Sequence, residues 1–209
     1  MLATKKFPTT EEELLELGGG LHLFPASFEE YLELIEKTEL RAEYTDGQIV
    51  LMSLASDPHE TLVGQLLFYL GFLQLTHADL TSRGSNRRIY VPGYTQSFSP
   101  DCFFVKGEAT FFEPESKPKM NTNPWLVVEV LSPSTKAYDL GTKLSVYQSI
   151  PSTQYILYAQ QDEAKVTLYQ RQTANRWSSQ DYDLDSPILR IADVDIDLRQ
   201  IYQRLGLVE

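Results

Sequence analysis

The sequence has few of the residues on which several common kinds of site depend. It contains one cysteine and three histidines among 209 residues. One cysteine cannot form an internal disulfide framework, and three scattered histidines exclude an ordinary Cys/His zinc cluster. This composition fits a reducing, intracellular compartment, and the cytoplasm is the predicted location.

Long apolar runs are also missing. Nowhere does the chain contain the roughly 18 to 20 uninterrupted apolar residues of a membrane span, and its first residues lack a signal-peptide pattern. The sequence therefore predicts no membrane association. With 42% hydrophobic residues the chain can bury a substantial core. We predict a flexible N-terminal arm over residues 1–20 and one compact domain over residues 21–209.

Basic residues are in the minority. The chain has 29 acidic and 18 basic residues, which gives a formal net charge of -11. Nonspecific binding to nucleic acid draws its affinity from clustered lysine and arginine, so this balance argues against a broad attraction to phosphate polymers. A local basic patch, or a groove in a dimer, is compatible with an acidic remainder.

The hydrophobic pattern predicts an α/β architecture with a mixed β-sheet flanked by helices. Ser27 and Glu30 match a capping box before a short amphipathic helix. Asp46-Gly47 between two apolar runs indicates a β-hairpin. Asp57-Pro58 predicts the start of a long helix reaching about Thr76, with the aspartate as N-cap. Further elements are expected as strands at 86–91, 101–105, 125–131, 154–159, 164–169 and 177–182, a surface loop between 106 and 123, and a closing helix at 198–205.

One acid is out of place in its segment. Residues 125–131 (WLVVEVL) are apolar except for Glu129, which predicts a central strand buried on both faces. A carboxylate buried in such a strand is unfavourable unless a cation or a hydrogen-bond donor meets it. The group that neutralises Glu129 is therefore the first feature to identify.

Two candidates follow from the sequence. Asp139 and Lys143 lie four residues apart at the start of a helical pattern, which can bring the lysine ammonium near Glu129. Asp101 opens another apolar run, and if the two strands are neighbours, Asp101 and Glu129 converge on a divalent cation. Such oxygen ligands favour Mg²⁺ or Mn²⁺. From the residues alone, a strand-edge acid and a buried acid satisfied by backbone donors or an arginine explain the pattern equally well.

These residues resemble the signature of a known family, the Uma-two restriction-endonuclease-like family, which is a branch of the PD-(D/E)XK nuclease superfamily. The similarity extends from about residue 28 to the C-terminus. The positions that carry it are acids, a lysine and a tyrosine in a characteristic order: Pro100-Asp101, the segment EVLSPST at 129–135, Asp139, Lys143 and Tyr147.

The resemblance implies a restriction-endonuclease-like core and a metal-dependent endonuclease that acts on DNA with Mg²⁺ or Mn²⁺. In the superfamily the two acids bind the metal, which assigns Asp101 and Glu129, and a lysine assists the attacking water. The usual lysine position is Leu131 in this chain, so the resemblance implies that Lys143 supplies the charge from the following helix. The backbone carbonyl of Val130 is a further candidate ligand.

Two auxiliary candidates lie earlier in the chain, and the family pattern matches both. Glu43 can approach the metal from the hairpin, although a cross-strand partner for Arg41 or Arg88 explains it almost as well. His59 can orient substrate or a ligand water, whereas a lone histidine near a helix N-terminus more often fills a surface niche.

Other polar candidates have similar alternatives. Asp139 is either part of the site or only a helix N-cap. Arg87 and Arg88 either meet phosphate or form the solvent face of an edge strand. At the level of the whole protein, the alternative to a nuclease is a binding or regulatory module that keeps the nuclease fold without turnover. A homodimer is expected by analogy with enzymes that cut two strands.

Overall fold

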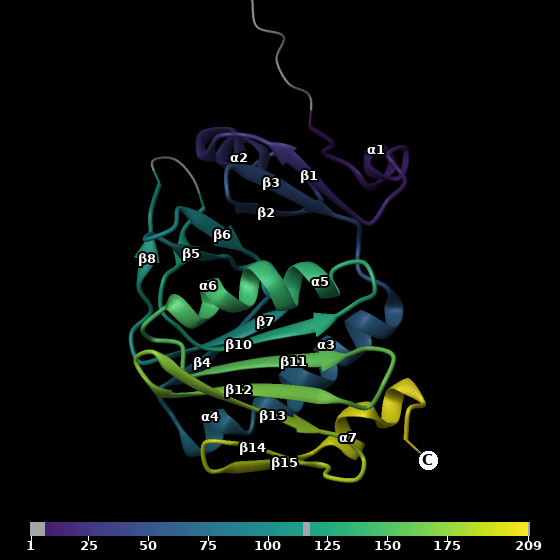
Figure 1. The fold of residues 1–209 in the computed structure, drawn as a ribbon, viewed down its shortest axis with the longest axis vertical. Coiled ribbons are helices and arrows are strands. Elements are labelled where there is room, and N and C mark those ends of the chain that lie inside the picture. Colours follow the sequence, from purple (N-terminus) through teal and green to yellow (C-terminus); the bar gives the residue numbers. More distant parts are fainter. Residues whose placement is uncertain (1–6, 115–117, 209) are drawn as a thin grey trace, which may run out of the picture.

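The computed structural model of the protein describes residues 7–114 and 118–208 (Figure 1). Its helical elements are α1 (Glu11–Leu15), α2 (Phe28–Leu34), α3 (Asp57–Leu70), α4 (Leu73–Thr76), α5 (Lys136–Tyr138), the π-helical turn η1 (Asp139–Lys143), α6 (Leu144–Ser149), α7 (Leu198–Tyr202) and the 3-10 turn η2 (Gln203–Leu205). Its strands are β1 (Leu21–Pro25), β2 (Arg41–Thr45), β3 (Gln48–Met52), β4 (Leu80–Gly84), β5 (Ile89–Val91), β6 (Gln96–Phe98), β7 (Cys102–Lys106), β8 (Phe111–Phe112), β9 (Met120–Asn121), β10 (Pro124–Leu131), β11 (Tyr155–Gln160), β12 (Val166–Thr173), β13 (Arg176–Tyr182), β14 (Ile188–Ile191) and β15 (Val194–Asp197).

A six-stranded mixed sheet forms the centre of the molecule, with the strand order β13-β12-β11-β10-β7-β4. Strand β10 pairs parallel with β11 and antiparallel with β7. All eight residues of β10 are buried, which confirms the predicted central strand. The strands predicted near 154–159, 164–169 and 177–182 are also confirmed as β11, β12 and β13.

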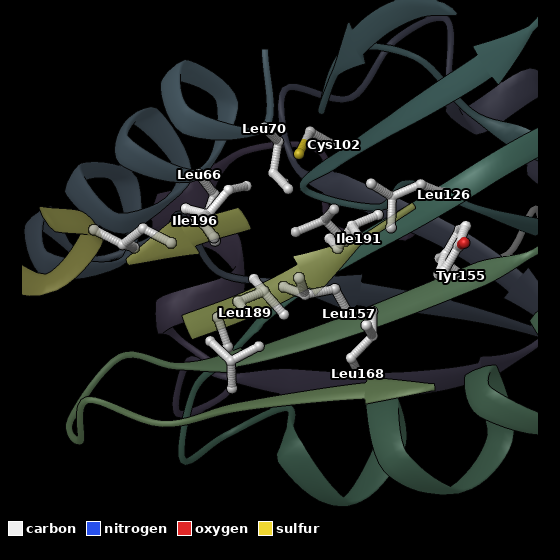
Figure 2. Packing of buried hydrophobic residues seen from close by; sticks show 14 of the residues in the cluster. Leu66, Leu70, Cys102, Leu126, Tyr155, Leu157, Leu168, Leu189, Ile191 and Ile196 are labelled. Atoms are coloured by element: carbon white, nitrogen blue, oxygen red, sulfur yellow. The ribbon is translucent and has the colours of Figure 1, made fainter. Parts of the chain in front are cut away.

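Helix α3, helix α7 and the β14–β15 hairpin cover one face of this sheet. Leu62, Leu66 and Leu70 recur every four residues along α3 and are fully buried, as the helical period requires. Figure 2 shows Leu66 and Leu70 of α3 in the packed layer that also contains Cys102 of β7 and Leu126 of β10. Burial of each such side chain contributes about 1.5–3 kcal/mol.

The opposite face is covered by α6 together with residues of β5 and β6. In Figure 1, α5 and α6 lie in front of the sheet and α3 lies behind it. Val127 and Leu131 of β10 face this second layer, as do Val146 and Tyr147 of α6. The residues between Val127 and Leu131 alternate across the strand, so the side chain of Glu129 also points to the α6 side.

A second sheet with the strand order β1-β3-β2-β6-β5-β9-β8 contains the predicted hairpin, here β2 and β3. Asp46 and Gly47 form its turn with positive φ angles of 50° and 75°, which a glycine and an aspartate tolerate. Helix α2 packs on this sheet and carries the predicted capping box, in which Ser27 accepts from Glu30 N and Glu30 accepts from Ser27 N. Both local predictions are confirmed.

The predicted arm, residues 1–20, lies partly outside the described residues. Its described part forms α1, and Leu14 of this helix is fully buried among side chains of α2 and the second sheet. One buried side chain thus anchors this segment, and the division of the chain at residue 20 stays a prediction. Within 7–114 and 118–208, none of the helices has the length and apolar character needed to cross a lipid bilayer.

Four local expectations are corrected. The long helix expected to reach about Thr76 ends at Leu70, and α4 follows it as a separate short helix. The N-cap position of α3 is Ser56. Asp57 is the first residue of the helix, and Pro58 is therefore the second and not the first. The segment expected as a surface loop contains β8 and β9, and Met120 in β9 is fully buried against the second sheet. Residues 80–84, which were not expected as a strand, pair with β7 as β4.

Candidate active site

Asp101 and Glu129 lie on the same face of neighbouring strands. In the antiparallel pairing of β7 and β10, Cys102 is opposite Val128, and continuing this register by one residue sets Asp101 opposite Glu129. Cys102 packs into the α3 layer, so its neighbour Asp101 points to the α6 side, where Glu129 also points. The predicted convergence of these two acids follows directly from this register.

Arg41 of β2 joins the two acids. Its guanidinium donates to Asp101 Oδ1 at 2.7 Å and to Glu129 Oε2 at 3.2 Å. It also donates to the backbone carbonyl of Ser99, in the segment that links β6 of one sheet to β7 of the other. An arginine from the second sheet therefore binds both carboxylates of the first.

Lys143 neutralises the other side of the cluster. Its ammonium lies 3.0 Å from Glu43 Oε1, 3.1 Å from Glu129 Oε1 and 2.9 Å from Asp139 Oδ1. The lysine is fully buried. Its position depends on η1, a π-helical turn between α5 and α6 that contains both Asp139 and Lys143, and such turns are frequent at functional sites.

Backbone and hydroxyl donors complete the cluster. Val130 N donates to Asp101 Oδ2 at 2.6 Å, Ser99 N donates to Glu43 Oε1 at 2.9 Å, and the Tyr147 hydroxyl donates to Glu129 Oε1 at 2.7 Å. Because the N–H and C=O groups of one strand residue point to the same side, the Val130 carbonyl also faces the side of Asp101.

His59, in the first turn of α3, is the remaining predicted residue of the cluster. Its Nε2 lies 3.2 Å from Asp101 Oδ1, and the side chain is almost completely buried. Burial disfavours the imidazolium, but the hydrogen bond and the charge of Asp101 outweigh it and raise the pKa of His59 above its ordinary value. The histidine is therefore a partner of the acid and not an isolated surface side chain.

The two acids ionise very differently. Burial opposes ionisation of Asp101, but the Arg41 guanidinium, His59 and the Val130 N–H together hold the pKa of Asp101 well below its ordinary value. For Glu129 burial dominates and raises the pKa to about 7, although Lys143 opposes this shift. Asp139 and Asp101 add repulsion that also favours protonated Glu129.

Both cations of the cluster stay charged. Burial alone lowers the pKa of a lysine or arginine, yet Asp139, Glu129 and Glu43 hold the pKa of Lys143 above its ordinary value. Asp101 and Glu129 do the same for Arg41. At neutral pH the Lys143 amine therefore carries its proton and acts as a hydrogen-bond donor and positive charge.

The raised pKa of Glu129 predicts a pH-dependent stability of the metal-free protein. Folded Glu129 keeps its proton up to about pH 7, whereas the ordinary value is 4.5. Between these values the folded state binds more protons than the unfolded state, so rising pH favours unfolding. We expect the free energy of unfolding to fall by up to about 3 kcal/mol between pH 5 and pH 8, measured by urea denaturation in EDTA.

Glu129→Gln is the control for this prediction. Glutamine does not titrate, so the variant should show a much flatter pH dependence between pH 5 and pH 8. The raised pKa of His59 adds a smaller loss of stability in the same direction, while Asp101, whose pKa is lowered, loses its contribution only at more acidic pH. Equal slopes for the wild type and Glu129→Gln would contradict the prediction.

A pocket of about 630 Å³ borders the cluster. Arg41, His59 and Asp101 line it, together with the turn 132–135. Glu43, Glu129, Asp139 and Lys143 are buried and are not among its lining residues. Arg88 lines the pocket, whereas Arg87 is exposed to solvent outside it.

The donor set fits a hard divalent cation. Oxygen atoms of Asp101, Glu129 and Ser99 already meet one positive group, the Arg41 guanidinium, and oxygen ligands of this kind suit Mg²⁺ and Mn²⁺. In the described part of the chain, no group of three His, Cys, Asp or Glu side chains is arranged as a ready-made metal cluster. The predicted set needs only two side chains, because the Val130 carbonyl is its third member.

The structure thus brings most of the predicted residues together. Glu43, Asp101, Glu129, Asp139 and Lys143 form one buried cluster, with His59 at its edge.

Asp139 is not a helix N-cap, because α5 begins at residue 136 and the Asp139 carboxylate binds Lys143. The sequence pattern indicated Arg41 only as a partner for Glu43, and its bridging of Asp101 and Glu129 was not predicted. Its position two residues before Glu43 on one strand, and hence on the same face, was the available signal.

A solved structure has the same fold. The chain is similar to the crystal structure of "a putative nuclease belonging to DUF820 from Anabaena variabilis ATCC 29413", with a TM-score of 0.68, 17% identity, and coverage of 87% of this chain and 99% of that chain. At this identity the likeness shows the fold alone, a mixed α/β fold with a restriction-endonuclease-like core.

The family follows from the sequence comparison. The model of the Uma2 family, described as "Putative restriction endonuclease", matches residues 28–199. The chain therefore belongs to the Uma2 family, as the signature residues indicated. Two relatives from Synechocystis sp. (strain ATCC 27184 / PCC 6803 / Kazusa) are similar to it. "Uncharacterized protein slr1290" is 31% identical over 71% of this chain and 76% of its own length, and "Uncharacterized protein sll1609" is 28% identical over 71% and 82%.

Proposed function

We propose that this protein is a divalent-metal-dependent endonuclease that hydrolyses phosphodiester bonds in DNA. The observation that carries the proposal is that Asp101 and Glu129, from neighbouring strands, both bind the guanidinium of Arg41, a residue that lines a pocket. Membership of a family described as "Putative restriction endonuclease" supports the same chemistry.

In this proposal Asp101, Glu129 and the Val130 carbonyl hold Mg²⁺ or Mn²⁺. When bound, the metal supplies positive charge to the scissile phosphate and lowers the pKa of a water ligand. Val130 N and the Tyr147 hydroxyl orient the two carboxylates, because each donates to one carboxylate oxygen and leaves the other oxygen free for the cation position. The chain itself therefore contributes a preorganised ligand set.

Lys143 has a supporting role in this proposal. Its protonated ammonium balances Glu129 and the auxiliary acids Glu43 and Asp139, and it orients these groups. Proton acceptance by Lys143 does not fit its charge state, because its raised pKa keeps the ammonium protonated at neutral pH.

Substrate binding is assigned to the groups that line the pocket. His59 lies beside Asp101 and can donate to a phosphate oxygen or to water, and Arg88 offers a positive charge on the wall. Arg87, which lies outside the pocket, can meet only phosphates of a longer nucleic acid that extends beyond it. A homodimer stays a prediction from analogy.

A cleavage assay tests the proposal. Supercoiled plasmid, linear duplex and single-stranded oligonucleotides are incubated with the protein in Mg²⁺, in Mn²⁺ and in EDTA. We expect strand cleavage in at least one divalent metal and none in EDTA, because the metal supplies the charge at the phosphate. A matched preparation of Asp101→Asn, purified in the same way, excludes a contaminating nuclease. Cleavage that persists in EDTA would refute the proposed chemistry.

Two observations favour a second function. Arg41 occupies the position between the two acids, and the chain carries a net charge of -11, both of which suit a nuclease-fold binding or regulatory module without turnover. Calorimetric titration with Mn²⁺ separates the two functions when combined with the cleavage assay. Metal binding without cleavage of any substrate would favour the module.

A further inference from the structure

Arg41 differs from the other charged groups of the cluster in its access to solvent. About a quarter of its side chain is exposed, with a relative area of 24%, whereas the side chains of Glu43, Asp101, Glu129, Asp139 and Lys143 are at most 4% exposed. Arg41 lines the pocket, and Glu129 does not. The guanidinium therefore lies between the pocket and the buried carboxylate of Glu129.

The oxygen atoms that bind Arg41 are the ones proposed to bind the metal. The guanidinium nitrogens lie 2.7 Å from Asp101 Oδ1 and 3.2 Å from Glu129 Oε2. A metal ion binds such oxygens at about 2.0–2.2 Å. A guanidinium and a divalent cation cannot share these oxygens, because their volumes overlap and their charges repel. Metal binding thus requires Arg41 to leave its present position.

The surroundings determine where Arg41 can go. Lys143 is fully buried and bound to three carboxylates, which leaves it no alternative position. Arg41 has a long side chain and is already partly in the pocket, so the open direction for its guanidinium is toward the pocket. A phosphodiester in that pocket offers the paired oxygen atoms that a guanidinium binds well.

We propose that the Arg41 guanidinium and the divalent metal ion exchange with each other at the carboxylates of Asp101 and Glu129. In the metal-free protein the guanidinium holds Asp101 and Glu129 together, and when a divalent ion binds, the guanidinium moves into the pocket and binds a phosphate of the substrate. The proposal rests on the metal site of the proposed function and deepens it. It assigns to Arg41 a phosphate-binding role that neither the family signature nor the metal site contains.

The charges of the cluster agree with this exchange. Four carboxylates, those of Glu43, Asp101, Glu129 and Asp139, face two cations, Arg41 and Lys143. Replacing Arg41 by a divalent ion raises the positive charge among the acids from two to three. The released guanidinium then meets a phosphate, so neither the acids nor the arginine is left without a partner.

The test compares Mn²⁺ binding by the wild type, Arg41→Gln and Arg190→Gln, measured by isothermal titration calorimetry. Arg41→Gln removes the competitor from the acid oxygens and should bind Mn²⁺ about tenfold tighter or more. Arg190→Gln removes the same charge from the exposed surface of β14, outside the pocket, so its affinity should stay within about threefold of the wild type. Thermal melting in EDTA should also show a lower Tm for Arg41→Gln that Mn²⁺ restores.

Substrate affinity tests the second half of the exchange. With saturating Mn²⁺, Arg41→Gln should bind a DNA oligonucleotide about tenfold more weakly than the wild type, because one phosphate contact is lost. If Arg41→Gln cannot be purified, Arg41→Lys serves instead, with smaller changes of the same signs. The opposite signs of the two changes distinguish exchange from a general loss of structure, which would weaken both.

Two outcomes overturn the inference, and they can be told apart. Mn²⁺ binding by Arg41→Gln that is equal to or weaker than that of the wild type refutes the exchange and leaves the proposed metal site intact. No Mn²⁺ binding by either protein refutes the proposed metal site, and the exchange with it.

Discussion

Asp101→Asn is expected to reduce metal-dependent DNA cleavage by on the order of 1,000-fold or more. Asparagine keeps the shape of the side chain and one oxygen that can accept from Val130 N, but it removes the negative charge that faces Arg41 and His59. A neutral amide is a poor ligand for a hard divalent ion, so the loss should appear in both metal affinity and cleavage rate.

The fold should survive this substitution. Arg41 keeps Glu129 and the Ser99 carbonyl as partners, so its charge is not left buried alone. Circular dichroism and thermal melting in EDTA would verify this. Asp195→Asn in the β14–β15 hairpin makes the same chemical change outside the pocket and should cleave like the wild type. Cleavage by Asp101→Asn at the wild-type rate and with the wild-type metal requirement would remove Asp101 from the site.

Lys143→Met is expected to lower the free energy of unfolding of the metal-free protein by about 3–5 kcal/mol. Methionine fills a similar volume but leaves Glu43, Glu129 and Asp139 without their shared ammonium. Removing only one partner of a buried ion pair destabilises a protein far more than replacing both partners by hydrophobic residues, because the remaining charge stays buried and unpaired. Urea denaturation at pH 8 in EDTA measures the loss.

Lys136→Met is the matched control for this variant. Lys136 begins α5, the helix before η1, but it is exposed and donates to Gln160 at the surface, so its replacement should change stability by less than about 1 kcal/mol. The deficit of Lys143→Met should shrink at pH 5, because Glu129, with a pKa raised to about 7, is protonated there. Similar stabilities for the two lysine variants would show that the ammonium of Lys143 does not stabilise the cluster.

The position of the two acids was predictable from strand alternation. Residues 125–131 are apolar on both faces, so this segment had to be a central strand, and its single acid had to point into one of the two covering layers. Asp101 stands at the start of the neighbouring apolar run. Two acids at matching positions of adjacent strands meet when the register allows it, and here the antiparallel register of β7 and β10 places them opposite each other.

The missed elements share a physical cause. Strands β8 and β9 have two residues each and are held by pairing with β5 and with each other, not by their own propensity. In the π-helical turn η1, Asp139 and Lys143 both belong to the buried cluster, and their carboxylate and ammonium are paired. Such features depend on tertiary contacts, which sequence patterns do not report.

The capping box, the hairpin, the central strand with its buried acid and the family of the chain could all be predicted from the sequence. The pairing of cations with acids depends on tertiary contacts. Arg41 and Asp101 are 60 residues apart in the chain, and Arg41 and Glu129 are 88 apart. Their contact arises because the segment before β7 passes from one sheet to the other and brings β2 over the acids. Ion pairing across such separations depends on how the two sheets join, and no local pattern encodes that geometry.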